Sequence, residues 1–236
     1  MDGFDRASEL WIWVARLPPL IFAITVHEVA HGWVAKQFGD PTAQNAGRLT
    51  LNPIRHIDPI GTIVVPILLA LFSPFILGWA KPVPVDFRRL NNPRRDMILV
   101  AAAGPASNIA MALFWALIMV ASLLYLPVWG GGQANLLIDD MAKFGILVNL
   151  FLAVFNMVPI PPLDGGRVLA GLLPPPMARV LDTIEPFGIL IIIGIFLLDS
   201  FTSVDILLPL ILVPVAELQN VFYSVAEYLL MMAGVA

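Results

Sequence analysis

Hydrophobic residues fall in long continuous runs along this chain, without the strict alternation of exposed strands. Six apolar segments can be traced, and they cover residues 10–38, 59–80, 97–126, 144–162, 186–198 and 206–232. About 20 consecutive apolar residues are enough for a helix to cross the hydrocarbon core of a bilayer. Membrane β-barrels instead show alternating dyads, which these runs lack. The pattern therefore predicts an all-α, polytopic membrane helix bundle with about six apolar segments.

Composition supports the membrane prediction and narrows the chemistry. Of the 236 residues, 59% are hydrophobic and 13% are charged, whereas average soluble domains carry about 25% charged residues. The excess apolar surface must therefore face a lipid bilayer. The chain has no cysteine, so disulfides and thiolate metal sites are excluded and any metal must use histidine and carboxylate. With a net charge of −4 and no basic run, we expect no nucleic-acid partner.

Basic residues are distributed unevenly among the connections between apolar segments. Connections 32–58, 81–96 and 163–185 carry lysine or arginine, whereas 127–140 and 199–205 carry only acids. The positive-inside rule then places the three basic connections in the cytoplasm and the N-terminus outside. Because the first nine residues carry three acids and one arginine rather than a basic n-region, we expect the first apolar segment to be retained.

The second apolar segment conflicts with this orientation, because both of its flanking connections are predicted to be cytoplasmic. Segment 59–80 contains Pro66, Pro74 and Gly78, which favour a break or a turn. Two alternatives stay open. Either 59–80 is a re-entrant hairpin, or it is a plain span with one misplaced basic loop.

The strongest chemical signal is His27-Glu28-Val29-Ala30-His31 in the first apolar segment. Histidines four residues apart lie on one face of a helix, where both imidazoles can bind one metal ion. Glu28 beside them can reach a metal-bound water. The alternative is a pair of core histidines that only form hydrogen bonds. Ionisable groups inside a membrane helix are costly and need partners, which favours the metal site.

A catalytic zinc ion usually has three protein ligands, so a third must come from elsewhere in the chain. Asp164 is the candidate, because it follows the run Pro159-Ile160-Pro161-Pro162 and precedes two glycines. Prolines open a helix and glycines let backbone approach closely. Asp164 could equally be a turn residue that caps the next helix, and the residues alone leave both interpretations open.

Several motifs in order resemble the site-2 protease family of intramembrane zinc metalloproteases, in its compact prokaryotic branch without PDZ or CBS domains. The resemblance covers residues 20–170. Besides the histidine motif it rests on 104–108 (Gly-Pro-Ala-Ser-Asn), 156–165 (Asn-x-x-Pro-x-x-x-Leu-Asp-Gly), 47–53 and 78–85. It implies one zinc ion held by His27, His31 and Asp164, with Glu28 as the general base. It also implies a prokaryotic inner or plasma membrane. The positive-inside orientation places His27, His31 and Asp164 at similar depth, toward the cytoplasmic side.

The resemblance extends to substrate contacts. It implies that Asn156 lies near the scissile carbonyl, with Asn108 as a second candidate that could instead pack helices together. Extended, β-like segments in the connections would pair with an unfolded substrate, and the residues expected to contribute are Gly47, Leu49, Pro82 and Val83. His56 is a candidate regulatory ligand or a locally paired loop residue.

These expectations define a single membrane-embedded domain over residues 1–236, with a catalytic core at about 10–170 and additional helices at 180–236. The expected function is hydrolysis of peptide bonds in or near transmembrane segments of membrane proteins. The alternatives are a transporter or channel, and a membrane metal-binding protein without catalysis. The sequence names neither the substrate nor the oligomeric state.

Overall fold

The computed structural model describes residues 3–65, 78–125, 133–202, 205–206 and 208–234. In this part of the chain all regular structure is helical, and no β-strand forms. The α-helices are α1 (Gly3–Gln37), α2 (Thr42–Asn45), α4 (Pro93–Tyr125), α5 (Gln133–Asn156), α6 (Asp164–Leu172), α7 (Pro175–Ile184), α8 (Gly188–Phe201) and α9 (Val213–Met232). Shorter helical turns are η1 (Pro53–His56), η2 (Pro59–Val64), η3 (Phe87–Arg89), η5 (Glu185–Phe187) and η6 (Leu208–Leu212).

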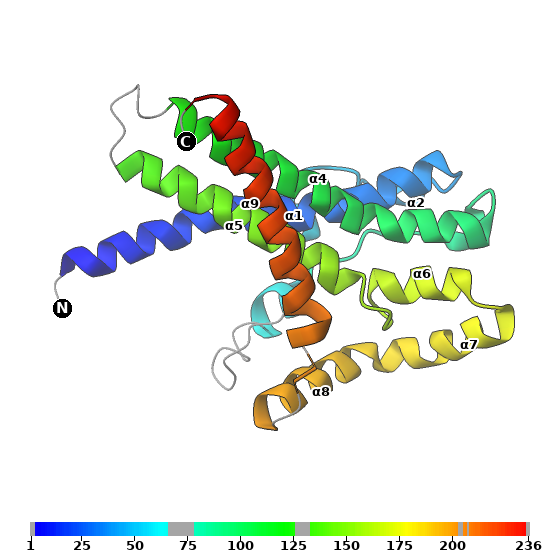
Figure 1. The fold of residues 1–236 in the computed structure, drawn as a ribbon. Helices are drawn as coiled ribbons and strands as arrows, with labels where there is room; N and C mark the ends of the chain where they lie inside the picture. The colour runs from blue at the N-terminus through cyan, green and yellow to red at the C-terminus, as the bar shows by residue number, and fades with distance from the viewer. Residues whose placement is uncertain (1–2, 66–77, 126–132, 203–204, 207, 235–236) are drawn as a thin grey trace.

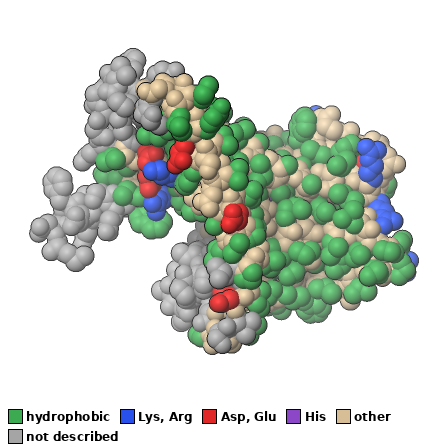
Figure 2. Space-filling view, in the orientation of Figure 1, with side chains coloured by type: hydrophobic (Ala, Val, Ile, Leu, Met, Phe, Trp, Pro, Cys, Tyr) green, Lys and Arg blue, Asp and Glu red, His purple; other side chains and the backbone are tan. Residues whose placement is uncertain are grey.

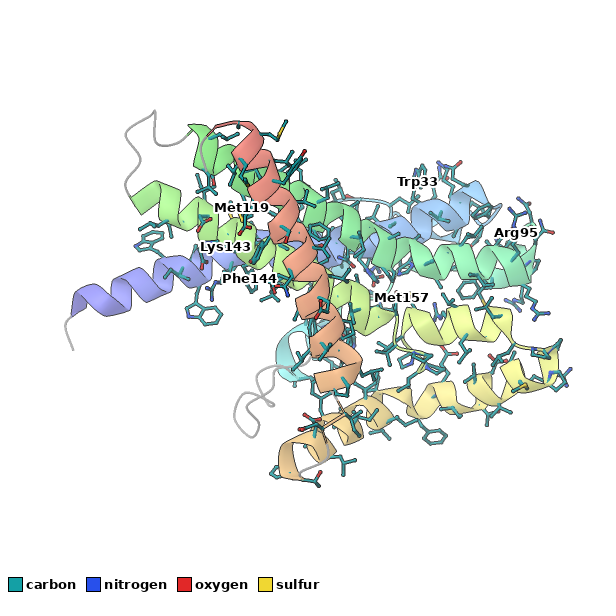
Figure 3. The ribbon with its side chains drawn as sticks, in the orientation of Figure 1. Trp33, Arg95, Met119, Lys143, Phe144 and Met157 are labelled. Carbon is teal, nitrogen blue, oxygen red and sulfur yellow. The ribbon has the colours of Figure 1, made fainter. Side chains whose placement is uncertain are left out.

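Three long helices, α1, α4 and α5, form the central bundle, and α9 crosses over α4 and α5 (Figure 1). The short helix α6 packs against α4, while α7 and α8 continue from it below the bundle (Figure 1). Along the bundle, Trp33 and Arg95 lie at the end opposite Met119 and Lys143 (Figure 3). The core between the long helices is apolar, and Ala112, Ile146 and Leu150 are fully buried in it.

The prediction of an all-helical membrane bundle is confirmed. Among the residues that the structure describes, four helical stretches are long and apolar enough to cross a membrane: 11–37, 93–124, 175–199 and 209–232. The count of six segments is not confirmed, and the choice between a re-entrant and a spanning second segment lies largely outside the described residues.

The β-like segments expected at 47–53 and 78–85 are not confirmed either. Within the described residues both are irregular. The reason is visible at 79–81, where the Trp79 N–H donates to the Gly61 carbonyl and the Lys81 N–H donates to the His56 carbonyl. These donors reach carbonyls in turns rather than in a neighbouring strand.

The acidic connection predicted at 127–140 is shorter than expected, because α5 already begins at Gln133. Asp139 and Asp140 therefore lie on the helix. Asp139 pairs with Lys143 at 2.7 Å, one turn further on. Asp140 accepts two hydrogen bonds from Arg16 of α1, at 2.8 and 2.9 Å. These ion pairs compensate the charges, so the helix extends through a stretch that hydropathy alone assigns to a loop.

Candidate metal centre

Three predicted ligand residues converge where α1, α4 and α6 meet. His27 and His31 come from consecutive turns of α1, and Asp164 is the first residue of α6. The two Nε2 atoms lie 3.0 Å apart, and Asp164 Oδ2 lies 3.2 Å from that of His27 and 3.3 Å from that of His31. Residues separated by more than 130 positions thus meet at one point, where one potential ligand atom from each of the three residues lies within 4.8 Å of the other two.

One face of α4 orients both imidazoles. His31 Nδ1 donates to the carbonyl oxygen of Val100 at 2.7 Å, and His27 Nδ1 donates to Asn108 Oδ1 at 2.6 Å. A proton on each Nδ1 leaves the lone pair of each Nε2 free to bind a metal. Val100, Gly104 and Asn108 are spaced four residues apart, so they form one stripe opposite the histidine stripe of α1.

The orientation of Asn108 is itself fixed by a chain of hydrogen bonds. Its Nδ2 donates to the Ala23 carbonyl and to Asn149 Oδ1, and Asn149 Nδ2 donates to the Gly145 carbonyl. Since the two carbonyls only accept, both amides have one consistent orientation, with Asn108 Oδ1 facing His27. Both asparagines are fully buried. These contacts favour the packing interpretation of Asn108, because its amide is already engaged within the protein.

The convergence of acceptors fits a bound cation. Two imidazole lone pairs and a carboxylate repel one another in an apolar interior unless a positive charge lies between them. Asp164 Oδ2 is buried and has no hydrogen-bond partner among the described residues. Tetrahedral zinc with ligand bonds of about 2.0–2.1 Å would separate its ligand atoms by about 3.3 Å, close to the 3.0–3.3 Å found here. The donor set, two histidines and one carboxylate, is one that zinc accepts.

Gly104 has no side chain, and this leaves space for an ion beside the two imidazoles. A Cβ on Gly104 would lie 2.6 Å from both Cε1 and Nε2 of His27, and closer still to His31 Nε2. Glycine is therefore required where α4 passes the site. Gly165 and Gly166 let the start of α6 pack directly on the 157–161 backbone, where a Cβ would meet main-chain atoms of Val158 and Pro161 at 2.5 Å. This packing places Asp164 beside α1.

The predicted general base makes an unexpected contact. Glu28 is half-buried, and its Oε2 accepts a hydrogen bond from the backbone N–H of Val83 at 2.7 Å. The side chain of Val83 is buried, and it packs where Gly32 leaves room on α1 beside Leu49. The segment around Val83 therefore lies directly over the histidine motif.

Loop contacts hold this segment in place. Arg48 donates to the Lys81 carbonyl at 2.7 Å, and the Lys81 N–H donates to the His56 carbonyl at 2.9 Å. Further along, the Asp86 N–H donates to Asp40 Oδ2 at 2.7 Å, and Asp40 is fully buried at the end of α1. Both ends of the segment are thus tied to the part of the chain that carries the histidines.

The remaining candidates lie outside the ligand set. His56 is buried with its Nε2 2.9 Å from the Thr50 carbonyl oxygen, and it does not belong to the converging group. Asn156 ends α5 and donates to the Leu152 carbonyl at 2.9 Å. Gly47 has a φ of 64° at an exposed turn, where glycine is favoured. Pro82 is exposed beside Val83. These residues stay predictions.

Sequence reasoning missed two functional contacts. Asn149 is a lone amide in the middle of an apolar run, and a buried polar residue in a membrane helix is a signal for a structural or functional partner. That signal could have identified it. The backbone N–H of Val83 carries no such signal, because every residue except proline has one.

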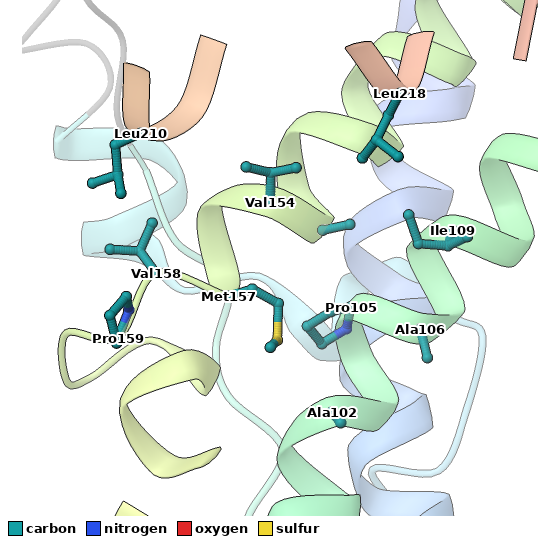
Figure 4. Close-up of a pocket in the computed structure, with 11 residues that line it drawn as sticks. Ala102, Pro105, Ala106, Ile109, Val154, Met157, Val158, Pro159, Leu210 and Leu218 are labelled. Carbon is teal, nitrogen blue, oxygen red and sulfur yellow. The ribbon is translucent and has the colours of Figure 1, made fainter. Parts of the chain in front are cut away.

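An apolar cavity of about 470 Å³ adjoins the site on the other side of α4 (Figure 4). Its walls come from α4, the end of α5 and the residues Leu210 and Leu218 (Figure 4). None of the candidate ligands lines it. Two parts of the cavity wall are nevertheless adjacent to the site in sequence. Pro105 follows Gly104, and 157–159 lead into the turn before Asp164.

A helical pair of histidines with an intervening glutamate and a distant carboxylate, set among apolar helices, defines a membrane-embedded metallopeptidase. Residues 125–195 match the family model described as Peptidase family M50. A protein of Bacillus subtilis (strain 168) named "Putative zinc metalloprotease YwhC" is 40% identical over 181 residues, which is 75% of this chain and 77% of that protein. The chain belongs to peptidase family M50, the site-2 proteases.

More distant relatives carry the same description. Rip2 of Mycobacterium tuberculosis (strain ATCC 25618 / H37Rv) is 30% identical over 188 residues, covering 78% of this chain and 66% of Rip2. MJ0611 of Methanocaldococcus jannaschii is 43% identical over 74 residues, about a third of each chain. No solved structure matches this chain. The predicted family is therefore confirmed.

Gly104 offers a direct test of the metal site. In Gly104→Ala the new methyl group occupies the space between the imidazoles, so we expect bound divalent metal to fall from near one ion per chain to near zero. The measurement is metal content of the purified protein by mass spectrometry. Gly194→Ala is the matched control, because a Cβ there meets nothing within 4 Å. Full metal content in Gly104→Ala would place the site elsewhere.

Proposed function

We propose that this membrane protein is an intramembrane zinc metalloprotease that hydrolyses peptide bonds in or near transmembrane segments of other membrane proteins. One Zn²⁺ would be held by His27, His31 and Asp164. The observation that carries the proposal is the convergence of three acceptor atoms beside Glu28, among helices long enough to cross a membrane. The relatives named as zinc metalloproteases support the choice of metal.

When bound, zinc supplies a Lewis acid that polarises a carbonyl and lowers the pKa of water to about 7. The chain supplies the rest. Val100 and Asn108 keep each Nδ1 protonated, so the lone pair of each Nε2 would be free to hold the ion. Asp164 adds a negative charge, which would attract the dication to this point.

Glu28 would act as the general base that takes a proton from water and later returns it to the leaving amine. Its two oxygens are not equivalent. Oε2 accepts the Val83 N–H, so Oε1 is the atom that would move the proton. This partly buried hydrogen bond to the main chain also restricts the rotamer of Glu28, and fixed geometry is what general-base catalysis requires.

The segment over the site would receive the substrate as an extended strand. The N–H groups of Trp79, Lys81 and Val83 point toward the protein. Alternate residues of an extended chain point the other way, and there Pro82 and Pro84 have no N–H. The outer edge therefore offers carbonyl oxygens, which suit the N–H groups of an unfolded substrate. Asn156 donates one amide N–H to the Leu152 carbonyl, and its second amide N–H would be the donor for a developing oxyanion.

The orientation and the outline of the domain belong to the same proposal. We place the site toward the cytoplasmic side of an inner or plasma membrane, because the connection 81–96 carries five basic residues. We also keep the catalytic core at 10–170, with later helices as a second part of one domain. No observation favours a transporter or a non-catalytic metal protein, and neither needs a carboxylate positioned as Glu28 is.

Glu28→Gln separates chemistry from metal binding. We expect zinc content to stay near one ion per chain, while cleavage of a reconstituted single-span membrane protein falls by about 10²–10⁴-fold, as loss of a general base predicts. His27→Ala combined with His31→Ala should lose the metal as well. Asp182→Asn, on the exposed face of α7, is the control for charge removal. Wild-type cleavage by Glu28→Gln would refute the assigned base.

Val83→Pro tests the main-chain contact to the base. Proline removes the N–H but keeps an extended backbone, so we expect kcat to fall about 10-fold to 100-fold with KM and zinc content little changed. Val83→Ala keeps the N–H and loses only methyl groups, so its kcat should stay closer to wild type. Equal losses in both variants would show that side-chain packing, not the N–H, is what matters.

The absence of native cysteine makes the orientation measurable with single engineered cysteines. Arg95→Cys, at an exposed position in the first turn of α4, should resist a membrane-impermeant maleimide in intact cells and react after permeabilisation. Trp11→Cys, near the opposite end of α1, should react in intact cells. Labelling of the first variant from outside would reverse the proposed orientation.

A further inference from the structure

Helix α9 has two faces with opposite character. One face packs on α4 and α5 through Val215, Phe222 and Ala226. The other face is exposed and carries four polar side chains, Glu217, Asn220, Ser224 and Glu227. We call these four residues the polar stripe. Figure 2 shows acidic side chains on a surface otherwise covered largely by hydrophobic ones.

Helical geometry confirms that the polar stripe is a single feature. At about 100° per residue, Asn220 and Ser224 each lie about 160° from Phe222 around the axis, and both glutamates lie about 140° from it. The stripe therefore runs directly opposite the packing face. Glu217 and Glu227 are ten residues apart, which spans about 15 Å along the helix.

The stripe belongs to a helix that is long and apolar enough to cross a membrane, over residues 209–232. Both glutamates lie within about 10 Å of the centre of that span. Half the thickness of a hydrocarbon core is about 15 Å, so both carboxylates would lie at hydrocarbon depth. Carboxylates facing lipid there are costly, and they normally face a partner.

This chain provides no such partner among its described residues. The lysine and arginine side chains in ion pairs are Arg16, Arg88, Arg89, Lys143 and Arg167, and each of them pairs with an acid outside α9. Neither glutamate forms a hydrogen bond within the described residues. A second copy of the chain would bring acids against acids across a symmetric contact, which is unfavourable. The partner that would neutralise the polar stripe is therefore expected on a different protein.

We propose that the polar stripe of α9 docks a transmembrane helix of another membrane protein, one that carries lysine or arginine at bilayer depth. The basic side chain would pair with Glu217 or Glu227, and Asn220 and Ser224 would add hydrogen bonds between the helices. This role does not depend on the peptidase chemistry, because the stripe lies on the exposed side of α9. The partner's chemistry is thus defined as a basic transmembrane helix.

The test uses the full-length protein in phospholipid vesicles, with fluorescently labelled transmembrane peptides of leucine and alanine. One peptide carries a central lysine, a second carries leucine there, and a third carries glutamate. We expect energy transfer from the labelled protein to show the lysine peptide binding about tenfold more tightly than the leucine peptide, with the glutamate peptide weakest. In Glu217→Gln combined with Glu227→Gln, the preference for lysine should disappear.

Controls make each outcome decisive. Asp182→Asn removes an acid from α7 and should keep the lysine preference. Glu28→Gln should keep it too, so docking and catalysis fail separately. Equal binding of the lysine and leucine peptides, or an unchanged preference in the double glutamine variant, would overturn the proposal. So would ready maleimide labelling of Ser224→Cys in peptide-free vesicles, which would mean that the stripe faces water.

Discussion

Electrostatic repulsion among three buried acceptors is the constraint around which this structure is organised. Two imidazole lone pairs and a carboxylate are held within 3.3 Å of one another, where water cannot separate them. Such an arrangement is stable only if a cation lies at the centre or if the surrounding helices resist its expansion. Here α4 packs against one side of the three acceptors and the glycine-rich start of α6 packs against the other, so both oppose their separation. The metal and the bundle therefore stabilise each other, since binding to the folded state adds to its stability.

Helix α4 has the central role in this arrangement. Its stripe of Val100, Gly104 and Asn108 supplies a carbonyl, an open space and an amide at successive turns. The carbonyl orients His31 of the facing helix α1, the open space leaves room for an ion, and the amide orients His27. The opposite face of α4 lines the apolar cavity. One helix thus separates the polar chemistry from the lipid-like surroundings.

The sequence predicted the helical class and the family, because each rests on a local pattern or on an ordered set of motifs. The ligand set of His27, His31 and Asp164 stays a prediction, which the convergence of its ligand atoms supports. Sequence reasoning failed where distant charges decide the outcome. The start of α5 was placed 11 residues late, since hydropathy cannot show that Asp140 meets Arg16 across the bundle. The β-like segments are not confirmed, since the partners of Trp79 and Lys81 are isolated carbonyls in turns, which no periodicity reveals. The hydrogen bond from the Val83 N–H to Glu28 could not be predicted, because its donor is a main-chain group that nearly every residue has.

The use of main-chain atoms has a consequence for how this site tolerates sequence drift. The contact that orients His31 ends on a carbonyl, and the contact that fixes Glu28 begins on a backbone N–H, so neither contact depends on the side chain at position 100 or 83. Those two side chains are constrained only by their burial. His27 instead depends on the Asn108 side chain, which in turn depends on Asn149. The sensitivity of the site to substitution therefore differs between its two halves. Substitution of either amide side chain, on α4 or α5, would disturb the orientation of His27. The contacts to His31 and Glu28 use main-chain atoms and would survive most side-chain changes.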